Sequence, residues 1–458
     1  MRVVICGAGQ VGYGIAERLA AEENDVTVID TSSRLIAAIR DTLDVRGVVG
    51  NGAHPDVLAQ AGAEEADMII AVTLADEVNM VACQVAHSLF NVPTKVARVR
   101  AQSYLQTHWR DLFSRDHMPI DVIISPEIEV GELVMRRLSI PSALDIVRFA
   151  DGQVIVLSLR CGEDCPVVDT PLRQLSELFP NLGAVVVGID RNGHVFAPTV
   201  GDAMLVGDVV HVVVQKEQVR RLLKIFGQDE PEAKRIIIAG GGNIGAYVAR
   251  SIEKQNPFAK VKVIESSPAR AVEIADDFER TVVLQGSALD QAILTEADVD
   301  NSDTMVAVTN DDEVNILSCV MARQLGAKRT LSLLNNPNYP AFAKALGIDA
   351  YINPRGVTVS KVLRHVRRGR IRGVHTIYNG AAEIIEAEAL DTSPMVGRPL
   401  REIDLPSGVR VGAVFRKGKA ITPDGETRIQ ARDRVILFAV ANRVRVVEQM
   451  FRVSLEFF

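Results

Sequence analysis

Two short glycine-rich motifs are the residues of this chain best suited to bind a ligand. Gly7, Gly9 and Gly12 follow a short apolar run, and Asp30 ends the next such run, 18 residues after Gly12. Between a strand and a helix, the first glycine permits a tight turn, the second lets the backbone approach a pyrophosphate, and the third lets the helix pack on the strand. The helix N-terminus then faces the anion. The acid would accept hydrogen bonds from ribose hydroxyls and repel a 2′-phosphate, so NAD or an adenosine nucleotide is expected rather than NADP.

The second motif has the same layout. Gly240, Gly242 and Gly245 follow another apolar run, and Glu265 ends the run after it, 20 residues past Gly245. The alternative for both copies is a glycine turn kept in a site that no longer binds a nucleotide. That alternative stays open for both copies, and it carries more weight for the second copy.

Other positions at the carboxyl ends of the predicted strands should line the same crevices. We expect the segment 50–52 near an adenine and the pair at 73–74 near the phosphates. In the first half the candidate nucleotide-binding residues are Gly7, Gly9, Gln10, Val11, Gly12, Asp30, Asn51, Gly52, Thr73, Leu74 and Arg98. In the second half they are Gly240, Gly242, Asn243, Ile244, Gly245, Glu265, Ser287 and Thr309.

The halves differ where a strand expected at 96–99 ends. Arg98 and Arg100 correspond there to Leu334 and Asn336. Because guanidinium groups bind phosphate oxygens well, the first site is predicted to hold extra phosphate charge, and the second is not expected to do so in the same way. An ion pair of Arg98 at the surface or at an interface is the alternative. For the nearby Asp76 and Glu77 we expect a structural role, with Asp76 as the N-cap of the following helix, and a part in lining the crevice is the alternative.

No catalytic or metal-binding residues are predicted. The eight histidines are scattered, with neither an HExxH motif nor a nucleophile elbow. A dehydrogenase needs a proton donor or acceptor beside the nicotinamide and a domain that positions its substrate. Each half offers only a small lobe of about 80 residues for that role. The nucleotide is therefore expected to act as a signal. An NAD-dependent oxidoreductase built on duplicated Rossmann domains is the alternative, and it would require turnover.

The chain is an internal duplication. The segments 71–73 and 76–79, which read AVT and DEVN, recur unchanged 236 residues later at 307–309 and 312–315. Matching positions continue through both halves, and the polar stretch 227–234 has the composition of a junction.

Each half alternates short β-branched runs with helical segments and then becomes strand-rich. Such alternation predicts a parallel sheet covered on both faces. The expected fold class is α/β, with two tandem copies of a Rossmann-like doubly wound parallel-sheet lobe, each followed by a small α+β lobe. The predicted boundaries are 1–140 for the first Rossmann domain, 141–227 for the first small lobe, 228–234 for a linker, 235–372 for the second Rossmann domain and 373–458 for the second small lobe.

Composition excludes several functional classes. The 458 residues carry a formal net charge of −7, the wrong sign for a protein held to nucleic acid by phosphate neutralisation. The longest stretch without Asp, Glu, Lys or Arg is 78–94, which is too short and too polar to span a bilayer, and no secretory signal begins the chain. Cytoplasmic localisation is therefore expected. Five cysteines, with Cys161 and Cys165 spaced unlike a zinc knuckle, favour reduced thiols.

A basic run stands between the second Rossmann domain and the last lobe. Six cations and no acid fall within 361–372. A solvated helix face is one interpretation, and a contact with anionic lipid or with an acidic partner is the other.

The repeated motifs GAGQVG at 7–12 and AVTxxDExN at 71–79 resemble those of RCK (KTN) domains, and the resemblance covers essentially the whole chain. It implies a regulatory protein peripheral to the cytoplasmic face of the membrane. The resemblance also implies a homo-oligomeric ring of about four chains beneath a TrkH-type potassium-translocating subunit. NAD, NADH, ATP or ADP would bind the crevices and gate that partner. A nucleotide sensor that regulates a different cation channel or an antiporter is a further alternative.

Overall fold

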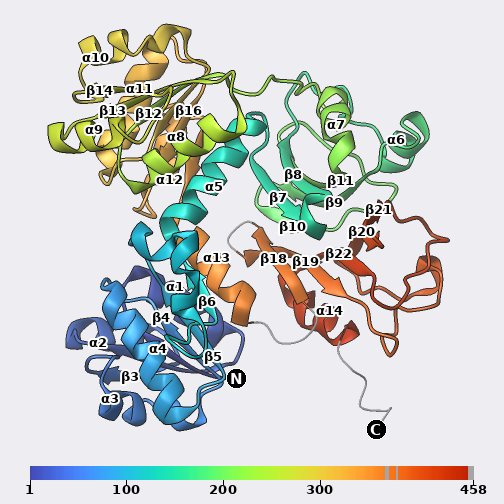
Figure 1. Cartoon of the computed structure of the whole chain (residues 1–458). Helices are drawn as coiled ribbons and strands as arrows, with labels where there is room; N and C mark the ends of the chain where they lie inside the picture. The colour runs from blue at the N-terminus through green and yellow to red at the C-terminus, as the bar shows by residue number, and fades with distance from the viewer. Residues whose placement is uncertain (367–370, 378–379, 452–458) are drawn as a thin grey trace. The chain divides into compact units, whose positions relative to one another are not determined.

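The computed structural model describes residues 1–366, 371–377 and 380–451. Along the chain, two large parallel sheets alternate with two small antiparallel sheets (Figure 1). The predicted fold class, with its tandem Rossmann-like and small lobes, is confirmed.

The first large sheet has six parallel strands in the order β3-β2-β1-β4-β5-β6. Its central strands are apolar and buried on both sides, as parallel strands between helical layers must be. The strand order changes direction between β1 and β4, which leaves a crevice at their carboxyl ends. The strands are β1 (Arg2–Cys6), β2 (Asp25–Asp30), β3 (Arg46–Val49), β4 (Met68–Ala71), β5 (Thr94–Arg98) and β6 (Val122–Ile124), and the helices are α1 (Gln10–Ala21), α2 (Ser33–Thr42), α3 (Pro55–Gln60), α4 (Asp76–Phe90) and α5 (Pro126–Ser139).

The second large sheet repeats this order as β14-β13-β12-β15-β16-β17. The strands are β12 (Arg235–Ala239), β13 (Lys260–Glu265), β14 (Val282–Gln285), β15 (Thr304–Ala307), β16 (Thr330–Leu333) and β17 (Ala350–Ile352). The helices are α8 (Asn243–Gln255), α9 (Pro268–Ala275), α10 (Gln291–Glu296), α11 (Asp312–Gln324), α12 (Tyr339–Ala345) and α13 (Pro354–Val366).

The last helix of each Rossmann lobe packs on the other lobe. Val362 and Leu363 of α13 are buried in the core of the first sheet, beside residues of α1. In the opposite direction, a Cβ added to Gly131 of α5 would lie 2.3 Å from the Tyr247 ring of α8. The two Rossmann lobes therefore exchange helices.

The small lobes have the same antiparallel topology. The first sheet runs β10-β9-β11-β8-β7 and the second runs β21-β20-β22-β19-β18. The strands of the first are β7 (Asp145–Phe149), β8 (Val154–Arg160), β9 (Ala184–Arg191), β10 (His194–Phe196) and β11 (Val209–Gln215), and those of the second are β18 (Ile371–Ile377), β19 (Ala382–Glu388), β20 (Val409–Arg416), β21 (Lys419–Ile421) and β22 (Arg434–Val440). Helices α6 (Leu172–Leu178), α7 (Val219–Ile225) and α14 (Val444–Met450) accompany them. Residues from both sheets share one apolar core around Phe438.

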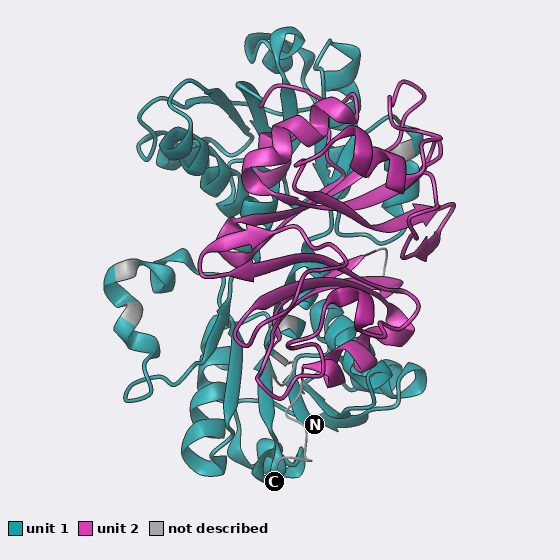
Figure 2. Cartoon of the chain, turned by 90° about the vertical axis from the view of Figure 1, so that its right-hand side faces the viewer, with its two compact units in different colours: residues 1–135, 233–366 teal, residues 136–232, 367–458 magenta. Residues whose placement is uncertain are grey.

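The chain divides into two compact units, coloured separately in Figure 2. One contains residues 1–135 and 233–366, and the other contains residues 136–232 and 367–458. The boundaries expected after residues 140, 227, 234 and 372 stay predictions. Within the described ranges, no helix is both long and apolar enough to cross a membrane.

Candidate functional site

The first glycine motif forms a turn that only glycine can occupy. Gly7 has a left-handed φ of 112°, and a Cβ there would lie 3.1 Å from the backbone nitrogen of Thr73. A Cβ on Gly12 would lie 1.8 Å from the Gly7 carbonyl oxygen, which is well inside contact distance. These two glycines therefore set the close approach of β1, α1 and the end of β4.

The second glycine of the motif, Gly9, leaves the start of α1 open. Gly9 is the N-cap of this 12-residue helix, no side chain caps the turn, and the first turn contains no acid. A Cβ on Gly9 would meet no atom within 4 Å. The free N–H groups and the positive end of the helix dipole therefore face open space that an anion can enter.

Asp30 is held in place at the end of β2. One carboxylate oxygen accepts the N–H of Ala8 at 2.7 Å, and the other accepts the N–H of Ser32 at 2.8 Å. Each oxygen keeps a second acceptor position. The carboxylate is thus oriented against the glycine loop and can still accept hydrogen bonds from hydroxyl groups of a ligand.

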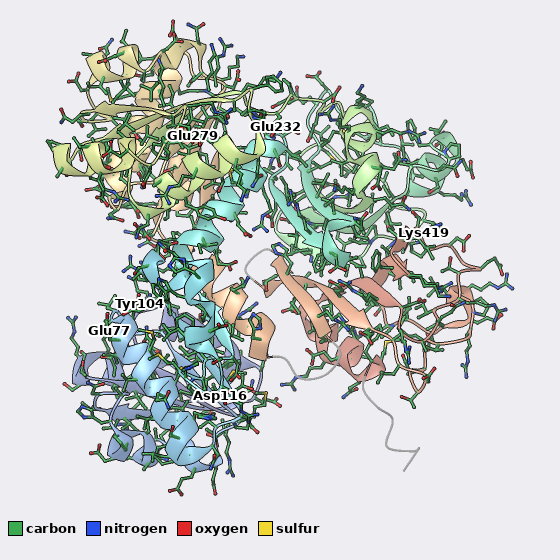
Figure 3. The ribbon with its side chains drawn as sticks, in the orientation of Figure 1. Glu77, Tyr104, Asp116, Glu232, Glu279 and Lys419 are labelled. Carbon is green, nitrogen blue, oxygen red and sulfur yellow. The ribbon has the colours of Figure 1, made fainter. Side chains whose placement is uncertain are left out.

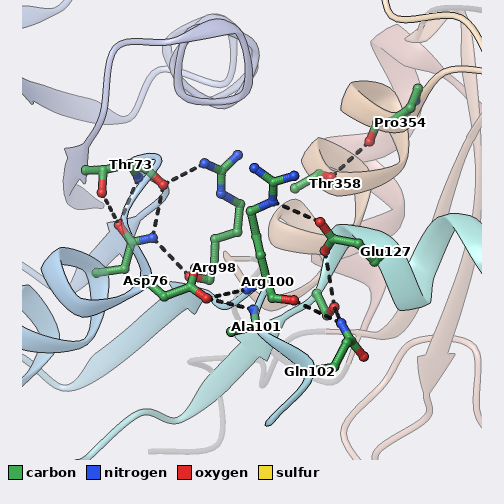
Figure 4. A network of polar contacts seen from close by, with 11 residues as sticks. Thr73, Asp76, Arg98, Arg100, Ala101, Gln102, Glu127, Pro354 and Thr358 are labelled. Atoms are coloured by element: carbon green, nitrogen blue, oxygen red, sulfur yellow. Dashed lines mark hydrogen bonds and ion pairs between the residues drawn. The ribbon is translucent and has the colours of Figure 1, made fainter. Parts of the chain in front are cut away.

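A buried amide ties together the ends of β4 and β5, which Thr73 and Arg98 mark in Figure 4. The Oδ1 of Asn79 accepts the N–H of Thr73 at 2.8 Å and its hydroxyl at 2.7 Å. The Nδ2 donates to the Thr73 carbonyl at 3.1 Å and to the Arg98 carbonyl at 2.9 Å. We did not predict Asn79 as part of the site, although its repetition as Asn315 was a signal that could have identified it.

Arg98 carries a buried guanidinium with spare hydrogen-bonding capacity. Its side chain donates from Nη2 to the Thr73 carbonyl at 2.6 Å, while Nε is buried without a partner. The residue is only 8% exposed, and burial, together with the nearby charge of Arg100, lowers the pKa of Arg98. The guanidinium donates to a carbonyl, so the surface ion pair considered as the alternative is not what the structure shows.

The expectation for Asp76 was wrong. The N-cap of α4 is Ala75, and Asp76 is buried in the first turn of the helix. Its Oδ2 accepts the N–H groups of Arg100 and Ala101, both at 2.8 Å, and so holds the loop after β5. Glu77, by contrast, is exposed (Figure 3). The Asp76 carboxylate accepts the N–H groups of Arg100 and Ala101 and does not cap its own helix, because the end of β5 lies beside the start of α4.

These groups surround one cavity of about 450 Å³ at the carboxyl ends of the strands. From the predicted set, the lining contains Gly7, Gly9, Gln10, Val11, Asp30, Asn51, Gly52, Thr73, Leu74 and Arg98, while Gly12 supports the turn from behind. Gly50, which was expected beside Asn51 and Gly52, lines the cavity as well. Lining residues that we did not predict are Ile29, Thr31, Leu35, Val72, Ala75 and Val78.

The second half reproduces the backbone of the site. Gly240 has a φ of 106°, and a Cβ on Gly245 would lie 1.9 Å from the Gly240 carbonyl. Gly242 is the open N-cap of α8, followed by Asn243 and Ile244. Glu265 accepts the N–H of Gly241 at 2.7 Å and that of Ser267 at 2.8 Å, as Asp30 does in the first half.

The phosphate side of the second site lacks a guanidinium at the end of β16. Thr309 and Asn315 make the same four hydrogen bonds as their first-half counterparts, at 2.8–3.1 Å. The structure corrects the predicted correspondence by one residue: the position of Arg98 is taken by Leu333, which pairs with Ile352 as Arg98 pairs with Ile124 and is 4% exposed. Asn335 takes the position of Arg100, because its N–H donates to Asp312 as that of Arg100 donates to Asp76. Ser287 follows β14, where its hydroxyl accepts the N–H of Leu289. Another arginine contacts the glycine loop of the second site: Arg270 donates to the Gly241 carbonyl at 3.0 Å.

The described residues form no cluster of metal ligands. Among them there is no group of three or more His, Cys, Asp or Glu side chains that could hold an ion. The five cysteines are free and buried.

The duplicated layout matches two known domain families in alternation. Residues 3–126 and 236–354 match the TrkA-N domain, and residues 156–227 and 384–452 match the TrkA-C domain. The chain is 64% identical to the Trk system potassium uptake protein TrkA of Azorhizobium caulinodans over 458 residues, with all of both chains covered. The chain belongs to the TrkA family. It is also 41% identical to the Halomonas elongata TrkA over 462 residues, again with all of both chains covered.

Solved structures support the TrkA-family fold. The crystal structure of the GsuK RCK domain superimposes with a TM-score of 0.60 at 18% identity, covering 98% of this chain and 94% of that chain. The GsuK channel bound to NAD gives a TM-score of 0.60 at 19% identity, covering 98% of this chain and 78% of that chain. The resemblance to RCK domains noted in the sequence is thereby confirmed at the level of fold.

Proposed function

We propose that this TrkA-family chain is the nucleotide-sensing regulatory subunit of a Trk-type potassium uptake system. One observation carries the proposal: the first cavity combines an uncapped helix N-terminus, a fixed carboxylate at Asp30 and the unpartnered Nε of Arg98. The helix N-terminus and the guanidinium suit the phosphates of an adenosine nucleotide. The carboxylate suits its ribose. Curated relatives named as potassium uptake proteins support the transport role.

The proposed ligands of the two sites differ. NAD or NADH suits both glycine loops because both keep an acid after the second strand. ATP or ADP suits the first cavity better, because Arg98 adds a cation there and Leu333, at the same position of the second half, adds none. One structural neighbour, the GsuK channel, is bound to NAD, which is in accord with the first assignment.

The bound nucleotide would act by favouring one arrangement of the elements that line the cavity. The cavity is lined from β1, β2, β4 and β5, and α1 also carries α13 of the other Rossmann lobe. A ligand that binds one arrangement of these elements more tightly than another shifts the population toward it. Coupling of about 1 to 3 kcal/mol per site, summed over several sites, reaches the roughly 5.5 kcal/mol that takes a two-state gate from mostly shut to mostly open.

The proposed partner is a TrkH-type potassium-translocating subunit, met at the cytoplasmic face of the membrane by a ring of about four copies of this chain. A ring suits the mechanism because it adds the contributions of many sites. In this function the nucleotide is a signal, and no step of the mechanism consumes it.

Calorimetric titration of the full chain with NADH, NAD, ATP and ADP tests the nucleotide sites. Asp30→Ala is expected to abolish binding to the first site only, and the matched variant Glu265→Ala to the second only. Unchanged affinity in both variants would contradict the site assignment. Stoichiometric oxidation of NADH in the presence of a carbonyl substrate would favour the oxidoreductase instead.

Purification from membranes tests the partner. The tagged chain is expected to bring down a TrkH-type subunit and to elute in solution as an oligomer of about four chains. A monomer that associates with no membrane transporter would overturn the regulatory role while leaving nucleotide binding intact.

A further inference from the structure

We propose that Asn79 is a positioning residue that makes the first site selective for ATP and ADP over NAD, by fixing the guanidinium of Arg98 at the cavity. This rests on the proposed function, because it concerns the nucleotide site assigned there. Asn79 lies on α4, is 0% exposed and does not line the cavity, so it acts on a ligand only through its neighbours.

The amide of Asn79 uses its whole hydrogen-bonding capacity. Oδ1 accepts the N–H and the hydroxyl of Thr73, and Nδ2 donates to the carbonyls of Thr73 and Arg98. A primary amide has two donor hydrogens and two acceptor positions, so all four are taken. Turned by half a rotation, the amide would place its N–H groups against the Thr73 N–H and its oxygen against the two carbonyls. The side chain therefore has one orientation, and the groups that it contacts are fixed with it.

Arg98 is tied to this amide at both ends. Its own carbonyl accepts Nδ2 of Asn79 at 2.9 Å, which fixes the start of the side chain. At the other end, the guanidinium points to Thr73, where Nη2 donates to the carbonyl at 2.6 Å (Figure 4). The same carbonyl accepts Nδ2 of Asn79 at 3.1 Å, and these two donors fill its two acceptor positions. The guanidinium is thereby held in one place before a ligand arrives.

The place of this guanidinium matters most for ligands with much phosphate charge. Of the described residues that line the cavity, Arg98 alone carries a positive charge. ATP and ADP carry more phosphate charge than NAD, whose pyrophosphate suits the helix N-terminus at Gly9. The affinity for ATP and ADP should therefore depend strongly on where Arg98 is held, and the affinity for NAD should depend on it much less.

The second half contains the same amide without a guanidinium. Asn315 makes the corresponding four hydrogen bonds at 2.8–3.1 Å, and one of them reaches the carbonyl of Leu333. Leu333 stands where Arg98 stands in the first half. Asn79 and Asn315 therefore share the task of holding two strand ends together, and only Asn79 has a charged side chain to position. Asn315 is the matched control.

Calorimetric titration of full-length variants with ATP and with NAD tests the proposal. All of them carry Glu265→Ala, which is expected to confine binding to the first site. Asn79→Ser keeps the net charge and removes the amide, so Arg98 is no longer fixed and must lose rotamer freedom when a ligand binds. We expect ATP binding to weaken about tenfold and NAD binding to weaken less than about twofold. Losses of equal size for both ligands, or no loss for ATP, would overturn the proposal.

Asn315→Ser separates positioning from a loss of stability. It removes the same amide from the second half, so we expect it to lower the urea midpoint by an amount similar to Asn79→Ser and to leave ATP affinity at the first site unchanged. Equal losses of ATP affinity in the two variants would reflect general destabilisation and overturn the proposal. Asn79→Ala, which adds no polar group in need of a partner, serves the same comparison where Asn79→Ser does not fold.

A double-variant cycle shows whether Asn79 acts through Arg98. ATP affinity is measured for Asn79→Ser, for Arg98→Leu and for the two combined. With no guanidinium to position, Asn79→Ser should cost less than about twofold in the Arg98→Leu background, whereas independent effects would multiply to about a hundredfold in total. Multiplied effects would overturn the positioning role and leave the proposed function standing. Wild-type ATP affinity in Arg98→Leu itself would overturn the phosphate role of Arg98 and, with it, both proposals.

Discussion

At the scale of single residues, Arg98 most clearly distinguishes the two halves. Its guanidinium is buried at the end of β5, held by one carbonyl and left with an unpartnered Nε beside the cavity. A buried donor without a partner is costly, and such a group is retained where a ligand supplies the missing acceptor. Phosphate oxygens supply it best.

Arg98→Leu, which copies Leu333 of the second half, is expected to weaken ATP binding to the first site by at least about tenfold, because a charge-assisted hydrogen bond is lost. NAD binding to the second site should stay unchanged, and calorimetry measures both. Equal ATP affinities of the variant and the wild type would show that Arg98 does not face the phosphates.

His211 makes the stability of the small lobes depend on pH. Its Nδ1 lies 2.8 Å from the Ser158 hydroxyl, Nε2 is buried without a partner, and the ring is 4% exposed. Burial, with the nearby charge of His375 adding to it, lowers the pKa of His211 from 6.5 to about 4. The unfolded chain therefore binds a proton between these pH values that the folded chain does not, and stability falls as pH decreases.

Between pH 7 and pH 4.5, this histidine alone should remove roughly 2.5 kcal/mol of stability. Calorimetric unfolding of the wild type and of His211→Asn measures the difference, and the variant should show a shallower slope over this interval. Parallel slopes in the two proteins would mean that His211 is not buried in its neutral form.

At the scale of elements, two glycines at the junction of β1 and α1 have different roles. Gly12 serves packing, because any side chain there would meet the Gly7 carbonyl. Gly9 serves access, because its missing side chain leaves space at the start of α1. The two roles can be tested as a matched pair.

Gly12→Ala is expected to destabilise the first Rossmann lobe by about 1 to 3 kcal/mol or more, since the backbone must shift to admit the methyl group. Gly9→Ala should keep the wild-type unfolding midpoint and lose nucleotide affinity. Urea unfolding and calorimetric titration separate these results. A destabilised Gly9→Ala, or a Gly12→Ala of full stability, would reverse the assignment.

At the scale of the whole molecule, neither Rossmann lobe is complete within its own half of the chain. Helix α13 belongs to the second half, yet Val362 is fully buried among the residues of the first sheet. Exchange of this kind gives the two Rossmann lobes a shared core, so we expect a change in the second lobe to alter the stability of the first.

Val362→Ala is therefore expected to lower the free energy of unfolding of the first lobe by about 2 kcal/mol through a cavity in its core. Trp109, the single tryptophan of the chain, lies in that lobe and reports its unfolding by fluorescence. Val272→Ala, at a residue of α9 that is 68% exposed, is the control. An equal midpoint in the wild type and Val362→Ala would show that α13 does not stabilise the first lobe.

The sequence by itself determined the duplication, the doubly wound sheets and the glycine loops with their acids, because these follow from local spacing: runs of four to six apolar residues, a turn that requires glycine, and an acid one strand later. Only the tertiary structure decided that Asp76 holds the loop after β5 and that Arg98 keeps an unpartnered nitrogen. The exchange of α5 and α13 also needed the structure. Each of these depends on contacts between segments that the chain brings together from a distance or through an irregular turn, and residue spacing carries no information about such geometry.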